Sequence, residues 1–155
     1  MKKLFLNLKA FLLSLKSKTP EKISKTLLRE AFQISSAESC TGGLVSSRLT
    51  DISGSSAYIK ANFVTYSNEA KHRILNVSEE TLNTHGAVSE ECAREMAQGL
   101  LQLTKSDIVI CTTGVAGPTG SERKPVGLMY MACGFNDKIS VKKINQLTHQ
   151  TIKSK

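Results

Sequence analysis

Residues 37–43 (Ala-Glu-Ser-Cys-Thr-Gly-Gly) constrain the fold more than any other stretch of this chain. A strand-like run precedes them at 32–36, and a helix-like run follows at 44–52. The chain therefore leaves a strand, turns on two glycines and starts a helix. The first N–H groups of a helix lack an intrahelical partner and attract anions, and glycines let a ligand approach the backbone. The pattern predicts a pocket for a phosphate or an oxyanion, with Ser39, Thr41, Gly42 and Gly43 around it.

A second stretch of similar composition lies at 112–120 (Thr-Thr-Gly-Val-Ala-Gly-Pro-Thr-Gly), after a strand-like run at 107–111. Two such turns at strand ends indicate one site built between them, with Thr113 and Gly114 on the second side. The spacing of its glycines matches neither the P-loop nor the dinucleotide-binding fingerprint. Glycine spacing alone therefore gives only weak support for nucleotide binding.

Strand-like and helix-like segments mostly alternate along the chain, which favours an α/β layered fold. The 155 residues suffice for one domain with a core of its own. We predict a single layered domain with a mixed sheet flanked by helices. Strands are expected at 32–36, 57–66, 107–111, 126–135 and 139–147, and helices at 20–31, 44–52, from 67 or 68, at 78–84 (or a turn) and from 90.

Positive charge gathers at the two ends of the chain. Residues 1–30 carry a net charge of +6 and residues 136–155 a net charge of +4, whereas residues 31–135 carry −2. A nucleic-acid-binding protein is expected to carry its basic surface on the folded body. The charge distribution therefore argues against nucleic acid as a partner.

The first segment, 2–16, has the pattern of an amphipathic basic helix, and we divide the chain into this segment (1–18) and a domain at 19–155. Lys9 interrupts its apolar run and no small-x-small cleavage site follows, so a signal peptide is not favoured. The run is too short and too polar to span a membrane. Packing on its own domain or on a partner subunit is favoured over contact with a membrane surface, which stays an alternative.

Cysteine and histidine residues give no sign of a metal site. The four cysteines are widely spaced without a C-x-x-C pair, and the three histidines are scattered. This distribution is typical of reduced thiols in a cytoplasmic protein rather than of a disulfide framework or a zinc site. No metal is expected.

Lys71 is the most informative residue for chemistry. It lies in the first turn of a predicted helix, where the positive end of the helix dipole disfavours a second positive charge and lowers a lysine pKa. A neutral lysine can serve as general base for a serine hydroxyl. Tyr66, just before that helix, could relay a proton. The plainer interpretations are an exposed lysine and a half-buried strand tyrosine.

Several hydroxyls could act with Lys71. Ser55 and Ser56 follow Gly54 in a turn, Ser39 lies in the first glycine-rich turn, and each can be read as an ordinary turn serine. Glu38 could bind a cationic group or a ribose hydroxyl, although an exposed loop carboxylate is the plainer reading. From the residues alone, the prediction stops at an oxyanion-binding pocket with serine, lysine and tyrosine nearby.

Five stretches of the chain carry a resemblance to a known family. They are AESCTGGL (37–44), LTDISGSSAY (49–58), FVTYSNEAKHRILNV (63–77), GAVSEECAREMAQG (86–99) and TTGVAGPTGSERKPVGLMY (112–130). Together they resemble the CinA C-terminal domain family, the nicotinamide-nucleotide amidases. The resemblance implies hydrolysis of the carboxamide of nicotinamide mononucleotide to nicotinate mononucleotide and ammonia, without a metal or cofactor. It also implies that the protein forms a homodimer. The small molecule that it binds is expected to be its nucleotide substrate.

Site residues follow from the resemblance motif by motif. It implies Ser56 as nucleophile, Lys71 as base and Tyr66 as proton relay. Ser39 is expected as a supporting hydroxyl, with the choice between Ser56 and Ser39 as nucleophile left open. The phosphate and ribose are expected at Thr41, Gly42, Gly43, Thr113 and Gly114.

The chain departs from the family at its C-terminal end. The family usually closes with a segment like F-x-G-D-R-x-x-I-R and a helix, whereas here Lys153 stands where the last arginine would be. A lysine cannot reproduce a bidentate guanidinium grip on phosphate. One hypothesis is that the 2–16 helix takes the place of the missing closing helix. The alternative function is a catalytically impaired relative, a nucleotide-binding or competence-associated module.

Overall fold

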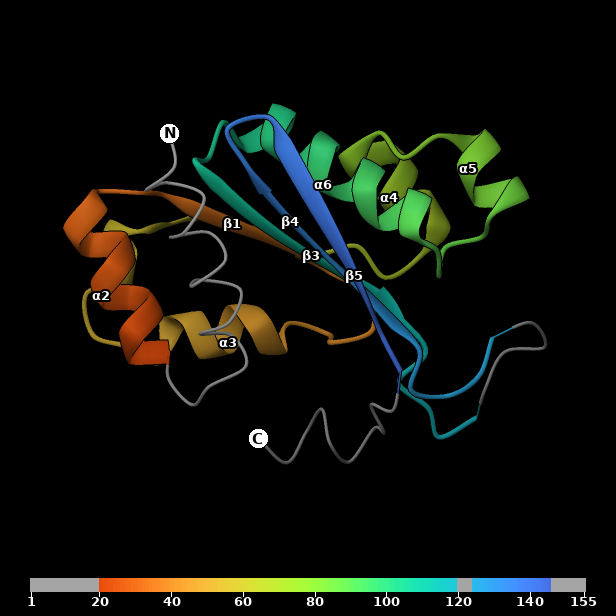
Figure 1. Cartoon of the computed structure of the whole chain (residues 1–155), viewed down its shortest axis with the longest axis horizontal. Coiled ribbons are helices and arrows are strands. Elements are labelled where there is room, and N and C mark those ends of the chain that lie inside the picture. The colour runs from red at the N-terminus through yellow and green to blue at the C-terminus, as the bar shows by residue number, and fades with distance from the viewer. Residues whose placement is uncertain (1–19, 120–123, 146–155) are drawn as a thin grey trace.

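The computed structural model describes residues 20–119 and 124–145. A five-stranded sheet lies between two layers of helices (Figure 1), which confirms the predicted α/β class. Helices α2 (Pro20–Glu30) and α3 (Leu44–Thr50) cover one face, and α4 (Asn68–Leu75), α5 (Glu79–Thr84) and α6 (Glu90–Thr104) lie on the other. The predicted helix at 2–16 and Lys153 lie outside the described residues.

The strand order is β2-β1-β3-β4-β5. The strands are β1 (Ile34–Glu38), β2 (Ile59–Val64), β3 (Ile108–Gly114), β4 (Met129–Phe135) and β5 (Lys138–Ile144). Strand β1 pairs in parallel with both β2 and β3, whereas β4 pairs antiparallel with β3 and β5. The sheet is therefore mixed, as predicted, and β1 is an inner strand.

Local sequence explains how several elements begin and end. Ser67 and Ser89 are the N-caps of α4 and α6, and their side chains accept hydrogen bonds from Ala70 N and Cys92 N. Asn136 and Asp137 join β4 to β5 with φ values of 46° and 61°. Two successive residues with positive φ give the tight turn that the twist of a hairpin requires. The predicted hairpin is thus confirmed.

Strand β1 lies two residues later than the pattern predicts, at Ile34–Glu38 instead of 32–36. All five of its residues are buried, including Ser35, Ser36 and Glu38. The strand exists as predicted, but its polar residues form no apolar run from which its end could be placed. The shift matters because it moves Glu38 from a loop into the core, directly before Ser39.

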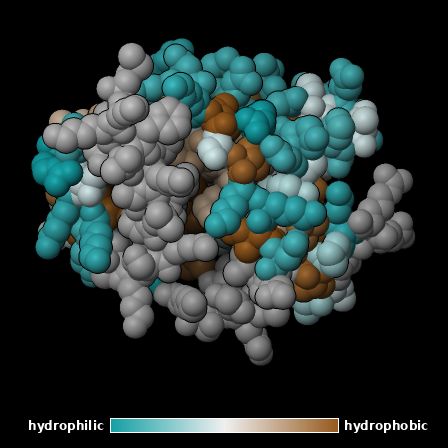
Figure 2. Space-filling model, viewed as in Figure 1, coloured by the Kyte–Doolittle hydropathy of each residue, from teal (hydrophilic) through white to brown (hydrophobic). Residues whose placement is uncertain are grey.

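Apolar side chains pack on both faces of the sheet. Leu75 of α4 joins Met96 and Leu100 of α6 on one face, and Leu27 of α2 packs with Tyr58 on the other. A Cβ added at Gly99 of α6 would lie only 1.7 Å from the Leu75 carbonyl oxygen, so the two helices are in close contact there. Hydrophilic residues cover the outer faces of α2 and of the α4–α6 layer (Figure 2). No helix in the described ranges is long and apolar enough to cross a membrane.

The connections between the parallel strands position the site. From β1 the chain crosses to β2 through α3 on one face, and from β2 it reaches β3 through α4, α5 and α6 on the opposite face (Figure 1). Ligands of open α/β sheets bind at the carboxyl ends of strands where successive connections leave to opposite faces. Here that point is the end of β1, next to the ends of β2 and β3.

Candidate functional site

Ser39 and Lys71 meet at the carboxyl end of β1. Ser39 directly follows the strand, and Lys71 reaches it from α4. The Lys71 Nζ donates to Ser39 Oγ at 3.0 Å, and to the carbonyl oxygens of Thr65 at 2.9 Å and Tyr66 at 3.1 Å. Among the described residues, the Ser39 hydroxyl is thus the one side-chain partner of the Lys71 amine, whose other two contacts are backbone carbonyls.

The environment of Lys71 disfavours a charged amine. Its side chain is 1% exposed, and none of the ion pairs recorded in the described part of the chain includes it. Burial lowers the Lys71 pKa below its usual value of 10.5, while the electrostatic effect of Cys92 and Cys40 acts in the opposite direction. The predicted direction of the Lys71 pKa shift is thus confirmed, and burial is its main cause.

The neighbouring thiols are poor nucleophiles. Burial raises the pKa of Cys40 and of Cys92 to about 11 each, so both stay protonated near neutral pH. The attacking group of a thiol enzyme is the thiolate. Of the side chains around the Lys71 amine, the Ser39 hydroxyl is therefore the group that a base can activate.

Glu38 is a residue whose role sequence reasoning missed. Its side chain is fully buried and faces α3, because successive residues of a strand point to opposite faces and Ser39 faces α4. The carboxylate accepts five hydrogen bonds, from Thr41 Oγ1 (2.5 Å), Gly43 N (3.1 Å), Val45 N (3.0 Å), Ser46 N (2.8 Å) and Ser46 Oγ (2.6 Å). Its position directly before the serine, six residues before the first residue of α3, was the available signal.

The capping by Glu38 changes the predicted phosphate site. The N–H groups of Gly43 and the first turn of α3 were expected to receive an anion from the ligand. The protein's own carboxylate occupies them instead. Gly42 and Gly43 do adopt positive φ values of 60° and 99°, and a Cβ at Gly42 would meet no atom within 4 Å. The turn is therefore open at Gly42, but the N–H groups at the start of α3 are already bonded to the Glu38 carboxylate.

Two threonines, Thr41 and Thr112, join the ends of β1 and β3, and a third, Thr113, bonds the segment before α6. The hydroxyls of Thr41 and Thr112 are 2.7 Å apart, and because the Thr41 proton goes to Glu38, Thr112 is the donor of that bond. Thr113 points to the opposite face, where its Oγ1 donates to Ala87 O at 2.6 Å. The structure thus places Thr41 and Thr113 in the protein's own hydrogen bonds at the site.

Gly114 permits close packing at the end of β3. A Cβ there would lie 2.6 Å from the Leu128 carbonyl oxygen and 3.1 Å from Cys40 Sγ. The residue lets the second glycine-rich stretch come next to the first. The two turns therefore lie together, as their position after neighbouring parallel strands predicts.

Ser56 is not brought to Lys71 within one chain. It is an exposed residue of a 3₁₀ turn (Ser55–Ala57) before β2, whereas Lys71 contacts Thr65 and Tyr66 after the end of β2. Strand β2 is six residues long, and at ~3.3 Å per residue it separates the two sites by roughly 20 Å. Within one chain Ser56 and Lys71 therefore do not pair, since the turn before β2 and the turn after it lie at opposite ends of that strand.

Tyr66 contacts Lys71 through its backbone. Its carbonyl accepts the amine's hydrogen bond, while its side chain is 74% exposed. The preceding residue, Thr65, is fully buried, and its Oγ1 is the one buried side-chain polar atom in the described ranges without a hydrogen-bond partner. Within those ranges no group of three or more His, Cys, Asp or Glu is arranged to bind a metal ion.

Comparison with protein families gives one match over most of the chain. The model of the CinA C-terminal domain matches residues 16–153. A CinA-like protein of Chloroherpeton thalassium is 56% identical over 120 residues, which cover 77% of this chain and 29% of that protein. A CinA-like protein of Chlorobium chlorochromatii is 55% identical over 113 residues, covering 72% of this chain and 27% of that protein. The chain thus spans less than a third of the curated relatives it matches.

Solved structures share the fold. The competence damage-inducible protein A of Klebsiella pneumoniae superposes with a TM-score of 0.83 at 35% identity, covering 86% of this chain and 84% of that one. The competence/damage inducible protein CihA of Agrobacterium tumefaciens gives a TM-score of 0.81 at 39% identity, covering 86% and 83%. The arrangement around Ser39 and Lys71 is therefore set in a known domain architecture.

Proposed function

The chain belongs to the CinA C-terminal domain family, and from this premise we propose that it is an amidohydrolase that deamidates nicotinamide mononucleotide. The products are nicotinate mononucleotide and ammonia. We further propose that it acts in the cytoplasm as a homodimer, without a metal or cofactor. The observation that carries the proposal is the contact between the buried Lys71 amine and the Ser39 hydroxyl.

The three partners of Lys71 can accept all three protons of a charged amine, and the same three positions also accommodate a neutral amine. A neutral amine has two N–H groups and one lone pair, and the two backbone carbonyls of Thr65 and Tyr66 accept the two N–H groups. The lone pair then faces Ser39 Oγ and accepts the hydroxyl proton as the oxygen attacks. A charged amine would donate to all three partners and could not take a proton.

The reaction then follows as two displacements. Ser39 Oγ bonds to the carboxamide carbon while its proton moves to Lys71 Nζ. The protonated Lys71 returns that proton to the amide nitrogen, the C–N bond breaks, and ammonia leaves an ester on Ser39. Lys71 next takes a proton from water, and the resulting hydroxide equivalent attacks the ester. Cleavage of the ester returns the Lys71 proton to Ser39 and releases the carboxylic acid, which ionises to the carboxylate by giving its proton to solvent.

Ser39 replaces Ser56 as the proposed nucleophile. Ser39 touches the base, whereas Ser56 lies at the other edge of the sheet. The Tyr66 hydroxyl is not needed as a relay, because the serine and the lysine are in direct contact. We retain Thr41, Gly42, Gly43, Thr113 and Gly114 as the wall of the pocket, and Lys153 as a phosphate contact remains a prediction.

Ammonia release from nicotinamide mononucleotide tests the proposal. We expect the full chain to release ammonia, and Ser39→Ala and Lys71→Ala each to lower kcat by at least about 1,000-fold, since residues of one catalytic unit fail together. Ser56→Ala separates the two assignments and is expected to stay within about twofold of wild type. Coupled enzymatic detection of ammonia gives the rates.

The opposite pattern of results would be equally clear. A large loss in Ser56→Ala with full activity in Ser39→Ala would restore the first assignment. A wild-type chain that binds nicotinamide mononucleotide but releases no ammonia would support the impaired, nucleotide-binding relative instead.

A further inference from the structure

The N–H groups of the turn after β1 are almost all paired. Ser39 N donates to Thr112 O at 3.0 Å, Gly42 N to Ser39 O at 3.1 Å, and Leu44 N to Thr41 O at 3.1 Å. The Glu38 carboxylate accepts the N–H groups of Gly43, Val45 and Ser46. Within the described residues, no oxygen accepts the N–H of Cys40 or of Thr41, and the recorded contact of the Cys40 N–H is with that residue's own thiol sulfur.

We propose that the Cys40 and Thr41 N–H groups bind the oxyanion that forms when Ser39 attacks the carboxamide, and that Glu38 is the positioning residue for them. The inference rests on the proposed amidohydrolase function. In acyl transfer the carbonyl oxygen becomes negative in the tetrahedral intermediate, and donors fixed in advance around it lower the barrier. The amide that follows a nucleophilic serine in the chain is such a donor in other hydrolase turns.

The placement of the two amides favours this use. Cys40 N is bonded directly to the Ser39 carbonyl carbon, so the covalent chain keeps it near Ser39 Oγ. Cys40 and Thr41 are both half-buried, so neither amide is enclosed in the core. The open space at Gly42 lies beside them in the chain, where a side chain would meet no atom within 4 Å. A ligand oxygen can therefore approach the pair.

Glu38 holds the turn from the other side of β1. Its carboxylate is fully buried and grips Thr41 through Oγ1 at 2.5 Å and Gly43 through the backbone at 3.1 Å. Cys40 and Thr41 thus lie in a turn whose far side, at Thr41 and Gly43, is bonded to the last residue of β1. Five donors share the Glu38 charge, which limits its repulsion of an oxyanion on the opposite side.

A boronic acid tests the donor pair directly. Pyridine-3-boronic acid can form a tetrahedral adduct in which boron bonds to Ser39 Oγ and the hydroxyl proton moves to Lys71. In the full chain labelled with ¹⁵N-cysteine and ¹⁵N-threonine, we expect the amide protons of Cys40 and Thr41 to shift downfield on adduct formation. The amide of Cys133, in the middle of β4, is the internal control and is expected to stay unchanged.

One result of that experiment would overturn the donor assignment, and another would overturn the proposed function. An adduct seen by ¹¹B NMR in wild type, absent in Ser39→Ala, and without a shift at either amide would overturn the donor assignment. If wild type forms no adduct and releases no ammonia, the proposed function fails.

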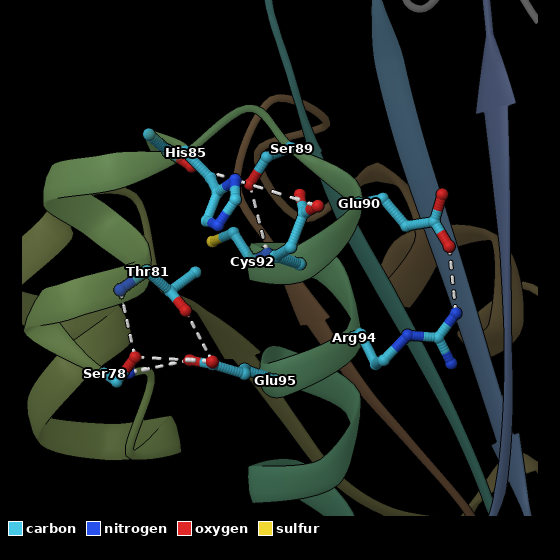
Figure 3. A network of polar contacts seen from close by, with 10 residues as sticks. Ser78, Thr81, His85, Ser89, Glu90, Cys92, Arg94 and Glu95 are labelled. Atoms are coloured by element: carbon cyan, nitrogen blue, oxygen red, sulfur yellow. Dashed lines mark hydrogen bonds and ion pairs between the residues drawn. The ribbon is translucent and has the colours of Figure 1, made fainter.

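Glu38→Gln tests the positioning role, and Glu95 of α6 supplies a matched control. Glu95 is also a carboxylate that caps a helix, accepting from Ser78 N at 2.7 Å and Thr81 Oγ1 at 2.5 Å at the start of α5 (Figure 3). Loss of either cap is expected to lower Tm. Glu38→Gln is also expected to lower kcat by about 100-fold with KM within about threefold, the signature of a transition-state interaction. Glu95→Gln is expected to keep its kcat.

Thr41→Val tests the same role if Glu38→Gln does not fold. It removes the single hydroxyl that links Thr41 to Glu38 and is expected to lower kcat by about tenfold at unchanged KM. Wild-type kcat in a folded Glu38→Gln or in Thr41→Val would overturn the positioning role, and so would an equal kcat loss in Glu95→Gln.

Discussion

At the scale of single residues, the site depends on how Lys71 is held. The chain buries an amine, gives it two carbonyls and a hydroxyl, and leaves it without a carboxylate partner among the described residues. A buried lysine without a counter-charge is costly while it is protonated. In the proposed catalysis this cost favours the neutral amine, which can accept the proton of Ser39.

The lowered Lys71 pKa predicts a pH dependence. Activity requires the neutral amine, so kcat/KM is expected to rise tenfold per pH unit below the Lys71 pKa and to level off above it. Because burial lowers that pKa from 10.5, the plateau begins below pH 10.5. The pH–rate profile of ammonia release checks this expectation. A profile that still rises at pH 10.5 would show a lysine with an ordinary pKa.

Thr65→Val predicts a gain in stability. The buried Oγ1 of Thr65 has no hydrogen-bond partner in the described part of the chain, so replacing it by a methyl group removes an uncompensated desolvation cost. The free energy of unfolding is expected to rise by about 1 kcal/mol. Urea unfolding measures the change.

Thr81→Val is the matched control for Thr65→Val. The hydroxyl of Thr81 is also buried but donates to Glu95 at 2.5 Å, so its loss is expected to destabilise by about 1–3 kcal/mol. If Thr65→Val instead lost activity while its stability rose, the hydroxyl would be a substrate contact.

Sequence reasoning found some of these residues and missed others for physical reasons. Lys71 was identified because a lysine at a helix start is unusual on electrostatic grounds. Glu38 was missed because burial of a carboxylate depends on donors that come from a different element, α3. The choice between Ser39 and Ser56 depends on which edge of the sheet each occupies, and no local pattern shows that.

At the scale of elements, the end of β1 directs two functional side chains to opposite faces of the sheet. Its last residue, Glu38, points to α3 and fixes the turn, and the next residue, Ser39, points to α4 and meets the base. The alternation of a strand makes this division automatic. A shift of one residue in the register of β1 would exchange the two side chains and disable both roles.

Because α4 carries Lys71 and packs closely on α6, a substitution that pushes the two helices apart is expected to lower both stability and activity. In Gly99→Ala the new methyl group would lie 1.7 Å from the Leu75 carbonyl oxygen at the end of α4, so α4 must move. We expect destabilisation by about 3 kcal/mol and a loss of kcat, because Lys71 is on the displaced helix. Thermal unfolding and ammonia release measure the two effects.

Gln98→Ala is the control on the same helix. Gln98 is exposed, and an exposed substitution on α6 is expected to change stability by no more than about 0.5 kcal/mol. Wild-type stability in Gly99→Ala would show that α4 yields to the methyl group without cost, contrary to the close contact described here.

At the scale of the whole molecule, the layers were predictable and the strand order was not. Alternating patterns indicated helices on a mixed sheet, and the tight Asn136-Asp137 connection indicated an antiparallel pair. The order β2-β1-β3-β4-β5 depends on long-range pairing between segments far apart in sequence. That order decides which turns meet, and it brings the glycine-rich stretches together while it leaves Ser56 at the opposite edge.

The inner position of β1 also bears on how the protein opens. Local unfolding starts in parts of a structure with few buried contacts and exposed hydrogen bonds, whereas strands paired on both sides exchange their amide protons only in larger openings. Because β1 is bonded to β2 and β3 and covered on both faces, Ser39 is attached to one of the last segments to come apart. Fluctuations at the outer strand β5 can therefore proceed while the serine stays in register with its neighbours.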